Sequence, residues 1–187
     1  MADPTPTPAL PIRPGALQSI VEFILELDKL KGVTRKTRPL GLERYENSAE
    51  HSWQIALLAA SLVRHAPRSA DGEGAIDLDR VIRMLLVHDI GEIDTGDTMV
   101  YVVGGWEERK AAERAAARRI FGLLPEPQGG LFLALWLEFE EGASPEARFA
   151  NAVDRAMPVL LNLANDGQSW RENGISHERV LGRVAAP

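Results

Sequence analysis

Apolar residues recur at three- and four-residue spacings along most of this chain, and this pattern most constrains what it can fold into. Within residues 17–30 they form one stripe, made of Leu17, Ile20, Val21, Ile24, Leu27 and Leu30. This spacing places side chains on one face of an α-helix. No series of alternating apolar and polar residues indicates a sheet. The sequence therefore predicts an all-α fold.

The expected helix boundaries follow from residues that begin or end helices. Besides the first stripe, helices are expected at residues 48–65, 77–90, 106–121, 129–141 and 145 to beyond 158, with a short one at 177–183. Ser48, Asp77 and Ser144 are the expected N-caps, because their side chains accept a hydrogen bond from a free backbone N–H. Pro158 is expected to bend its helix, since proline removes one backbone donor. Residues 92–105 are expected to be irregular.

Length and composition indicate one globular domain. The chain has 187 residues, of which 45% are apolar and 26% charged, the balance of an ordinary folded protein. Residues 1–15, rich in proline and threonine, are expected to form a disordered N-terminal leader, which leaves residues 16–187 as the domain. The chain has no cysteine, which excludes disulfides, thiolate nucleophiles and cysteine-based metal sites.

Charge and hydropathy exclude several classes of partner. The net charge of -6 argues against binding to a nucleic acid polymer or an anionic membrane. The longest apolar stretch, residues 55–63, is far shorter than the roughly 20 residues needed to span a bilayer. The N-terminal residues lack the pattern of a secretory signal. A cytoplasmic protein is therefore expected.

The chain has four histidines, and one begins a run of acidic residues. His88 opens HDIGEIDTGD, which contains Asp89, Glu92, Asp94 and Asp97. Negative charge at the end of a buried helix opposes the helix dipole, and a bound cation would reverse that penalty. Imidazole with carboxylate is a ligand set for Mn, Fe, Co, Ni or Zn. A hydrogen-bonded core histidine beside a solvated acidic loop is the alternative interpretation of this run taken alone.

The order of His51, His88–Asp89 and Asp154, each on a separate expected helix, resembles the HD-domain superfamily of metal-dependent phosphohydrolases. The segments ENSAEHSWQIALLA, LLVHDIGEIDTGD and LEFEEGASPEARFANAVDRAMPVL look like its 5′-deoxynucleotidase-like branch. The likeness extends from about residue 17 to residue 165. It implies an HD-domain helical bundle with a central metal site.

By this resemblance, one divalent metal ion (Mn, Co, Mg, Ni, Fe or Zn) is expected per chain. Its ligands would be His51, His88, Asp89 and Asp154. Four protein ligands leave positions open for water or substrate, as a hydrolytic metal requires. For Asp154 the alternative is a surface ion pair with Arg148 or Arg155.

Glu92 and Asp97 match the acidic pair of the deoxynucleotidase branch. Glu92 is hypothesised to deprotonate the attacking water, and Asp97 to hold a second water or the leaving-group side. A solvated acidic loop is the alternative. Asp94 is given no role.

A phosphate ester also needs a cation, and Arg35 in LKGVTRKTR resembles the family's phosphate-binding arginine. Arg44, nearer to the expected helix, is the competing candidate. The residue after the arginine is a tryptophan in the bacterial deoxynucleotidases, where it is linked to rejecting ribose. Here it is Lys36, so the preference between deoxyribose and ribose stays open.

The sequence thus predicts a phosphomonoesterase that hydrolyses a small phosphate ester, with a (deoxy)nucleoside 5′-monophosphate as first choice. A non-catalytic nucleotide-sensing HD module is one alternative. A di-iron HD redox enzyme, which needs further inward ligands, is another. His65 and His177 are expected to be structural. Related proteins are often dimers, so a homodimer is also expected, with Trp106 or residues 132–139 as its apolar face.

Overall fold

The computed structural model describes residues 15–66, 75–99, 101, 102 and 104–184. Apart from Gly15, the leader predicted at residues 1–15 lies outside the described residues. The described residues form nine α-helices and two 3-10 helices without a strand, and one isolated bridge joins Thr34 to Asn47. The all-α prediction is confirmed. No described helix is both long and apolar enough to cross a membrane.

Helices account for most of the described residues. In chain order they are α1 (Ala16–Leu27), η1 (Asp28–Gly32), α2 (Ser48–Leu62), η2 (Val63–His65), α3 (Leu78–Val87), α4 (Glu92–Thr95), α5 (Trp106–Phe121), α6 (Gln128–Glu141), α7 (Pro145–Ala164), α8 (Gln168–Glu172) and α9 (His177–Val184). The longest described connection, residues 33–47, joins η1 to α2. The helix expected at residues 106–121 has the predicted bounds. The short helices α4 and α8 were not predicted.

The beginning of α2 differs from the prediction. The N-cap is Asn47, not Ser48, because the Asn47 side chain accepts the backbone N–H of Glu50 and the Glu50 carboxylate accepts that of Asn47. This reciprocal pair is a capping box. Ser48 is the first helical residue, and its hydroxyl is free to donate to Glu92 at 2.6 Å. The predicted caps Asp77 and Ser144 are confirmed, and α7 continues through Pro158 to its end at Ala164.

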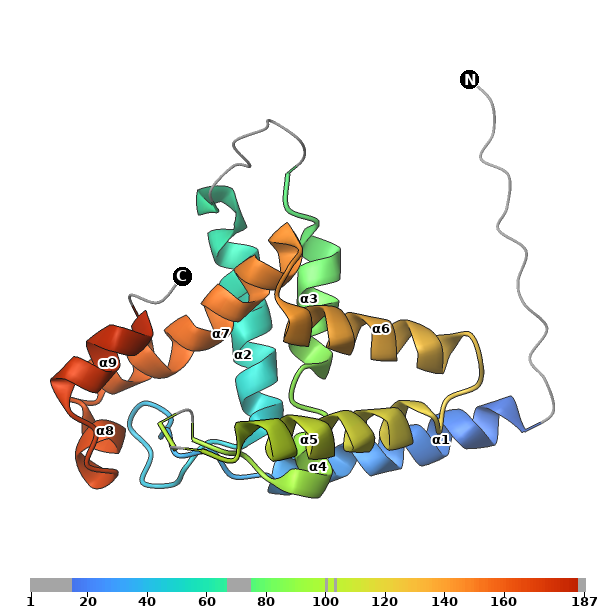
Figure 1. Ribbon diagram of the computed structural model, residues 1–187, viewed down its shortest axis with the longest axis horizontal. Helices are drawn as coiled ribbons and strands as arrows, with labels where there is room; N and C mark the ends of the chain where they lie inside the picture. Colours follow the sequence, from blue (N-terminus) through green and yellow to red (C-terminus); the bar gives the residue numbers. More distant parts are fainter. Residues whose placement is uncertain (1–14, 67–74, 100, 103, 185–187) are drawn as a thin grey trace.

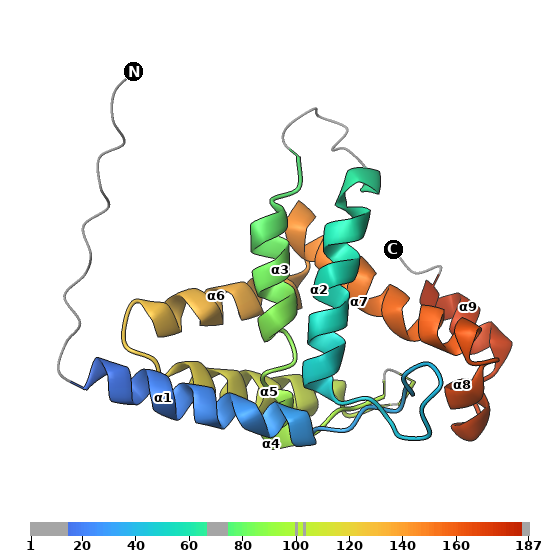
Figure 2. The same ribbon diagram turned by 180° about the vertical axis from the view of Figure 1, so that it is seen from behind.

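Two hydrophobic cores organise the helices. Figure 1 shows α2 and α3 side by side, with α7 crossing them, and these helices together with α6 enclose the first core. Figure 2 shows α1 lying along α5 in the other half of the molecule, where both pack with α6 around the second core. Ile55, Met84 and Val153 belong to the first core, and Phe121 and Trp136 to the second.

The end of α3 lies where the two cores meet. Met84 and Leu85 pack in the first core, whereas Val87 and Ile90 pack in the second. The turn after α3 also packs tightly on α5, since a Cβ on Gly91 would stand only 2.8 Å from the Glu113 carbonyl oxygen. Glycine is therefore required at this close approach. The contact fixes the His88–Asp89 pair between the cores.

Candidate metal centre

Three helices bring together two imidazoles and a carboxylate. His51 lies in the first turn of α2, His88 caps the end of α3, and Asp154 lies in the middle of α7. One potential ligand atom from each lies within 4.8 Å of the other two. Asp154 Oδ1 is 2.9 Å from His51 Nε2 and 3.7 Å from His88 Nε2. Residues far apart in the sequence thus converge on one point.

His88 is held in one orientation by its surroundings. Its Nδ1 lies 2.9 Å from the Leu85 carbonyl oxygen, and Trp136 Nε1 donates to the His88 carbonyl at 2.9 Å. The ring of Phe139 packs against the imidazole with centroids 4.9 Å apart. An Nδ1–H donated to Leu85 leaves the Nε2 lone pair directed at the cluster. Ligating histidines are commonly fixed in this way.

Asp89 lies beside these three residues. Its Oδ1 is 2.9 Å from His88 Nε2, and its Oδ2 accepts a 2.8 Å hydrogen bond from Arg35 Nη1. All four sequence-predicted ligands therefore lie in one neighbourhood. The alternative interpretation of Asp154 was a surface ion pair, but its carboxylate lies against the two imidazoles.

The electrostatics of the cluster favour positive charge. Burial alone would lower the pKa of His88, but the carboxylates of Asp89 and Asp154 outweigh it and raise that pKa well above its usual value. Burial lowers the pKa of His51, and Arg35 adds to this effect. For Asp154, the contacts with the two histidines outweigh burial and hold its pKa well below the usual range. The same carboxylates that attract a proton to His88 would attract a metal ion.

These residues fit a divalent cation. His88 Nε2 is buried, and among the residues described no acceptor is aligned with it for a hydrogen bond, although Asp89 Oδ1 lies only 2.9 Å away. Buried polar atoms are normally satisfied, so a ligand-type nitrogen that faces carboxylates without a hydrogen bond is suited to bind a cation. Nitrogen and oxygen donors from histidine and aspartate suit several divalent metals.

Glu92, the first residue of α4, and Asp97, two residues after that helix, border the cluster. Glu92 accepts the Ser48 hydroxyl, as described above, and Asp97 Oδ1 lies 3.8 Å from Arg35 Nη1. Burial raises the pKa of Glu92 to about 9, and the charge of Asp89 adds to the rise. Burial also raises the pKa of Asp97, although Arg35 opposes it. A cation held by Asp89 would weaken the repulsion that keeps Glu92 protonated.

The structure separates the two candidate arginines. Arg35 is mostly buried and contacts the carboxylates of Asp89 and Asp97. Burial opposes its charge, but these carboxylates outweigh it and raise the pKa of Arg35. Arg44 is exposed and binds Glu50 through both guanidinium nitrogens. Only the first of these two arginines lines the cavity described next.

A cavity of about 1010 Å³ lies against the cluster. Its lining includes Arg35, His88, Asp89, Glu92, Asp97 and Asp154. Other lining residues, among them Lys36, Trp106 and Lys110, are exposed at its rim. The cavity therefore connects the candidate metal ligands with solvent.

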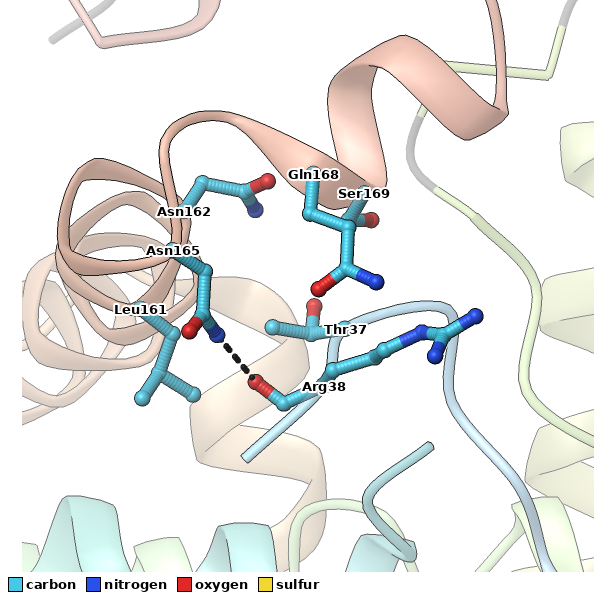
Figure 3. Close-up of a pocket in the computed structure, with 7 residues that line it drawn as sticks. All are labelled: Thr37, Arg38, Leu161, Asn162, Asn165, Gln168 and Ser169. Carbon is cyan, nitrogen blue, oxygen red and sulfur yellow. Dashed lines mark hydrogen bonds between the residues drawn. The ribbon is translucent and has the colours of Figure 1, made fainter. Parts of the chain in front are cut away.

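One side of the site is closed by the segment between η1 and α2, which packs against α7 and α8. The amide of Asn165 donates to the Arg38 carbonyl at 3.1 Å (Figure 3), and the Ser169 hydroxyl donates to the Lys36 carbonyl. Thr37 is buried at this seam. The contacts fix the segment that carries Arg35.

Several residues lie elsewhere or had not been predicted. His65 and His177 are exposed at helix ends, outside the cluster. Sequence reasoning missed the buried Glu46, Trp136 and Phe139, which surround the ligands. Trp136 and Phe139 belong to residues 132–139, which were expected as an apolar dimer face, but both side chains are buried in the cores. No local pattern marked Glu46.

The fold and the histidine–aspartate cluster define an all-helical protein with a candidate metal centre. The HD domain family model matches residues 27–187. The structure of a predicted metal-dependent phosphohydrolase from Magnetospirillum magnetotacticum is similar, with a TM-score of 0.82, 39% identity, and coverage of 94% of this chain and 87% of that chain. This chain belongs to the HD domain family of phosphohydrolases.

Curated relatives are more distant. The 5′-deoxynucleotidase HDDC2 of Homo sapiens is 28% identical over 144 residues, which cover 76% of this chain and 66% of the human protein. The 5′-deoxynucleotidase YfbR of Escherichia coli is 30% identical over 117 residues, which cover 60% of this chain and 57% of that protein. The chain thus matches about two thirds or less of the length of these two relatives.

Proposed function

We propose that this chain is a metal-dependent phosphomonoesterase whose first substrate class is the deoxynucleoside 5′-monophosphates. The observation that carries the proposal is the convergence of two imidazoles and two carboxylates at the inner end of an open cavity. The names of the two curated relatives support the choice of substrate. One divalent ion per chain is proposed, with His51, His88, Asp89 and Asp154 as its ligands.

A divalent ion at these ligands would lower the pKa of a bound water and neutralise a phosphoryl oxygen. Arg35 binds the remaining phosphoryl oxygens, because its planar guanidinium can donate two parallel hydrogen bonds. Its place beside Asp89 and Asp97 puts this cation next to the ligands.

Glu92 is the proposed general base. It takes the proton of the attacking water while the bond between phosphorus and the ester oxygen breaks, and the products are inorganic phosphate and an alcohol. Ser48 fixes one carboxylate oxygen of Glu92, which leaves the other for this proton. Asp97 is assigned to the leaving-group side, where the ester oxygen must gain a proton. No covalent nucleophile is needed, since phosphoryl transfer mostly requires positioning and charge neutralisation.

A substrate screen with a matched pair of variants tests this function. Metal-free protein is reconstituted with Mn²⁺ or Co²⁺ and assayed for phosphate release from deoxynucleoside, ribonucleoside and sugar monophosphates. The variant Glu92→Gln is expected to bind the metal like the wild type and to lose about 10²- to 10⁴-fold in kcat. The control Asp94→Asn, on the same short helix but paired with Arg119 at the surface, should keep full activity.

Two results would contradict the proposal. Full activity of Glu92→Gln would show that the base is another residue. Metal binding without turnover of any ester would favour a nucleotide-binding module over an enzyme.

A further inference from the structure

Glu46 is a buried acidic residue that the proposed reaction does not use. It is only 2% exposed, although it lies in the irregular segment between η1 and α2. Its Oε1 is 3.5 Å from Arg35 Nε and 3.7 Å from His51 Nδ1. Burying a carboxyl group is costly unless it has partners. The two groups that face it are the proposed phosphate-binding arginine and a proposed metal ligand.

The three facing atoms share one property. Arg35 Nε, His51 Nδ1 and Glu46 Oε1 are all buried, and none has a hydrogen-bond partner within the part of the chain that the structure describes. Two are nitrogens able to donate, and the third is an acceptor. Their separations are slightly longer than a hydrogen bond. A small movement of one carboxyl group would satisfy all three.

The two imidazoles of the centre differ in what holds their Nδ1 atoms. At His88 the Leu85 carbonyl oxygen serves this purpose, at 2.9 Å. At His51 the facing group is the Glu46 carboxyl. Metal-binding histidines usually donate the second ring N–H to a carbonyl or a carboxylate, which fixes the tautomer and the ring orientation.

The backbone holds Glu46 in this place. Its N–H donates to the Thr37 carbonyl at 2.9 Å, and its carbonyl accepts the Arg35 N–H at 3.0 Å. Arg35 and Glu46 are therefore opposite each other on two paired arms of the segment. The capping box that begins at the next residue, Asn47, fixes where α2 starts and so where His51 lies.

We propose that Glu46 is a positioning residue, which accepts hydrogen bonds from His51 Nδ1 and Arg35 Nε and thereby orients a metal ligand and the phosphate-binding group together. The inference rests on the proposed function, because it takes His51 to bind the ion and Arg35 to bind phosphate. Its consequence is that one carboxyl group sets both the affinity for the metal and the affinity for the phosphate.

Binding measurements on Glu46→Gln test this role. The substitution keeps the shape of the side chain but removes its charge. Titration of metal-free protein with Mn²⁺ should show an affinity about 10- to 100-fold weaker than that of the wild type. Inorganic phosphate should also bind the Mn²⁺-loaded variant more weakly. The control Glu43→Gln changes a fully exposed carboxylate in the same segment and should leave both affinities unchanged.

The outcomes separate this inference from the proposed function. If Glu46→Gln is folded and binds Mn²⁺ and phosphate like the wild type, the positioning role is wrong. A lower melting temperature with unchanged affinities also contradicts it, since that is the result of a purely structural role. His51→Ala is the reference: if it binds Mn²⁺ as tightly as the wild type, the metal centre itself is wrong and both proposals fail.

A measurement on the wild type keeps the inference testable if Glu46→Gln does not fold. In ¹⁵N NMR of the Zn²⁺-loaded protein, His51 should carry its proton on Nδ1. The chain has only four histidines, and the variants His65→Gln and His177→Gln identify the two exposed ones. An unprotonated Nδ1 in His51, or an Nδ1–H proton without the downfield shift of a hydrogen bond to a carboxylate, would overturn the proposal.

Discussion

The inner wall of the cavity and its rim are built in different ways. The inner wall consists of Arg35, His88, Asp89 and Asp154. Their side chains are largely buried, and the basic ones contact the acidic ones. The rim consists of Lys36, Trp106 and Lys110, which are exposed. Rim contacts are single and open to solvent, such as Lys110 Nζ to Glu140 Oε2 at 3.1 Å and Lys36 Nζ 5.8 Å from the centre of the Tyr45 ring.

This difference indicates that the inner wall determines the reaction and that the rim determines substrate selectivity. Removing one member of a buried, mutually paired set leaves an uncompensated charge, and the cost of doing so is several kcal/mol. Exposed ion pairs contribute about 0–1 kcal/mol. Substitutions at the inner wall should therefore slow the reaction of every phosphate ester, whereas those at the rim should change which ester fits. Lys36, the residue that left the preference between deoxyribose and ribose open, is a rim residue.

The largest effect is expected at Asp154, on the inner wall. Asp154→Asn removes the charge that faces both imidazoles and should lower kcat/KM by about 10³-fold or more, because several kcal/mol of charge stabilisation are lost. Phosphate release would measure the loss of turnover, and Mn²⁺ titration would measure the loss of affinity for the metal. The control His65→Ala changes an exposed histidine outside the cluster and should leave kcat/KM and the Mn²⁺ affinity unchanged. Retention of metal binding by Asp154→Asn would remove this residue from the ligand set.

The two candidate phosphate-binding arginines, Arg35 and Arg44, provide the next comparison. Arg35→Lys keeps the charge but loses the planar fork, so kcat/KM for a phosphate ester should fall by about 10- to 100-fold through a higher KM. The same change at Arg44, which binds Glu50 on the surface, should alter kcat/KM less than about two-fold. The reverse order of effects would assign the phosphate to Arg44.

A smaller and pH-dependent effect is expected at Glu113, which lines the cavity between the inner wall and the rim. Burial and then the carboxylate of Glu140 raise the pKa of Glu113 from 4.5 to about 7. Between these values the folded protein keeps a proton that the unfolded chain releases, so the free energy of unfolding falls as the pH rises. The stabilising contribution is complete below pH 4.5 and is lost as the pH passes about 7.

Glu113→Gln removes this loss. In the metal-free protein the variant should melt about 2 °C above the wild type at pH 8, and the gap should close towards pH 5. Thermal melts followed by circular dichroism measure it. Glu108→Gln, an exposed position on the same helix, should show no pH-dependent gap. An equal gap at both pH values would mean that Glu113 does not titrate in this range.

Much of the fold was readable from the sequence because its signals are local. A hydroxyl followed by proline begins α7 at Ser144–Pro145, and an alanine-rich stretch ends at Gly122 after α5. The helices α4 and α8 have four and five residues, too few for a periodic pattern to develop. The cap of α2 was misplaced because Asn47 and Ser48 are both good capping residues, although only Asn47 has a glutamate three residues later, the spacing of a capping box.

The candidate site was partly predictable for a related reason. His51, His88 and Asp154 stand out by residue type and order, and the structure brings their ligand atoms together. Glu46 does not stand out, because a glutamate in a segment rich in arginine and lysine resembles an ordinary solvated residue. Its burial depends on two neighbours, Arg35 and His51, which lie 11 and 5 residues away in the sequence and face it only once the irregular segment has folded back on itself.

The boundary between the two cores links metal binding to thermal stability. His51 and Asp154 come from helices of the first core, while the backbone of His88 is tied to Trp136 in the second. A metal ion bound at this boundary would hold the two halves of the molecule together. At about 100 times its Kd it would add about 2.7 kcal/mol to the unfolding free energy. Removal of the ion by a chelator would then destabilise both halves together. Calorimetry would record a melting temperature that rises with the concentration of free metal ion.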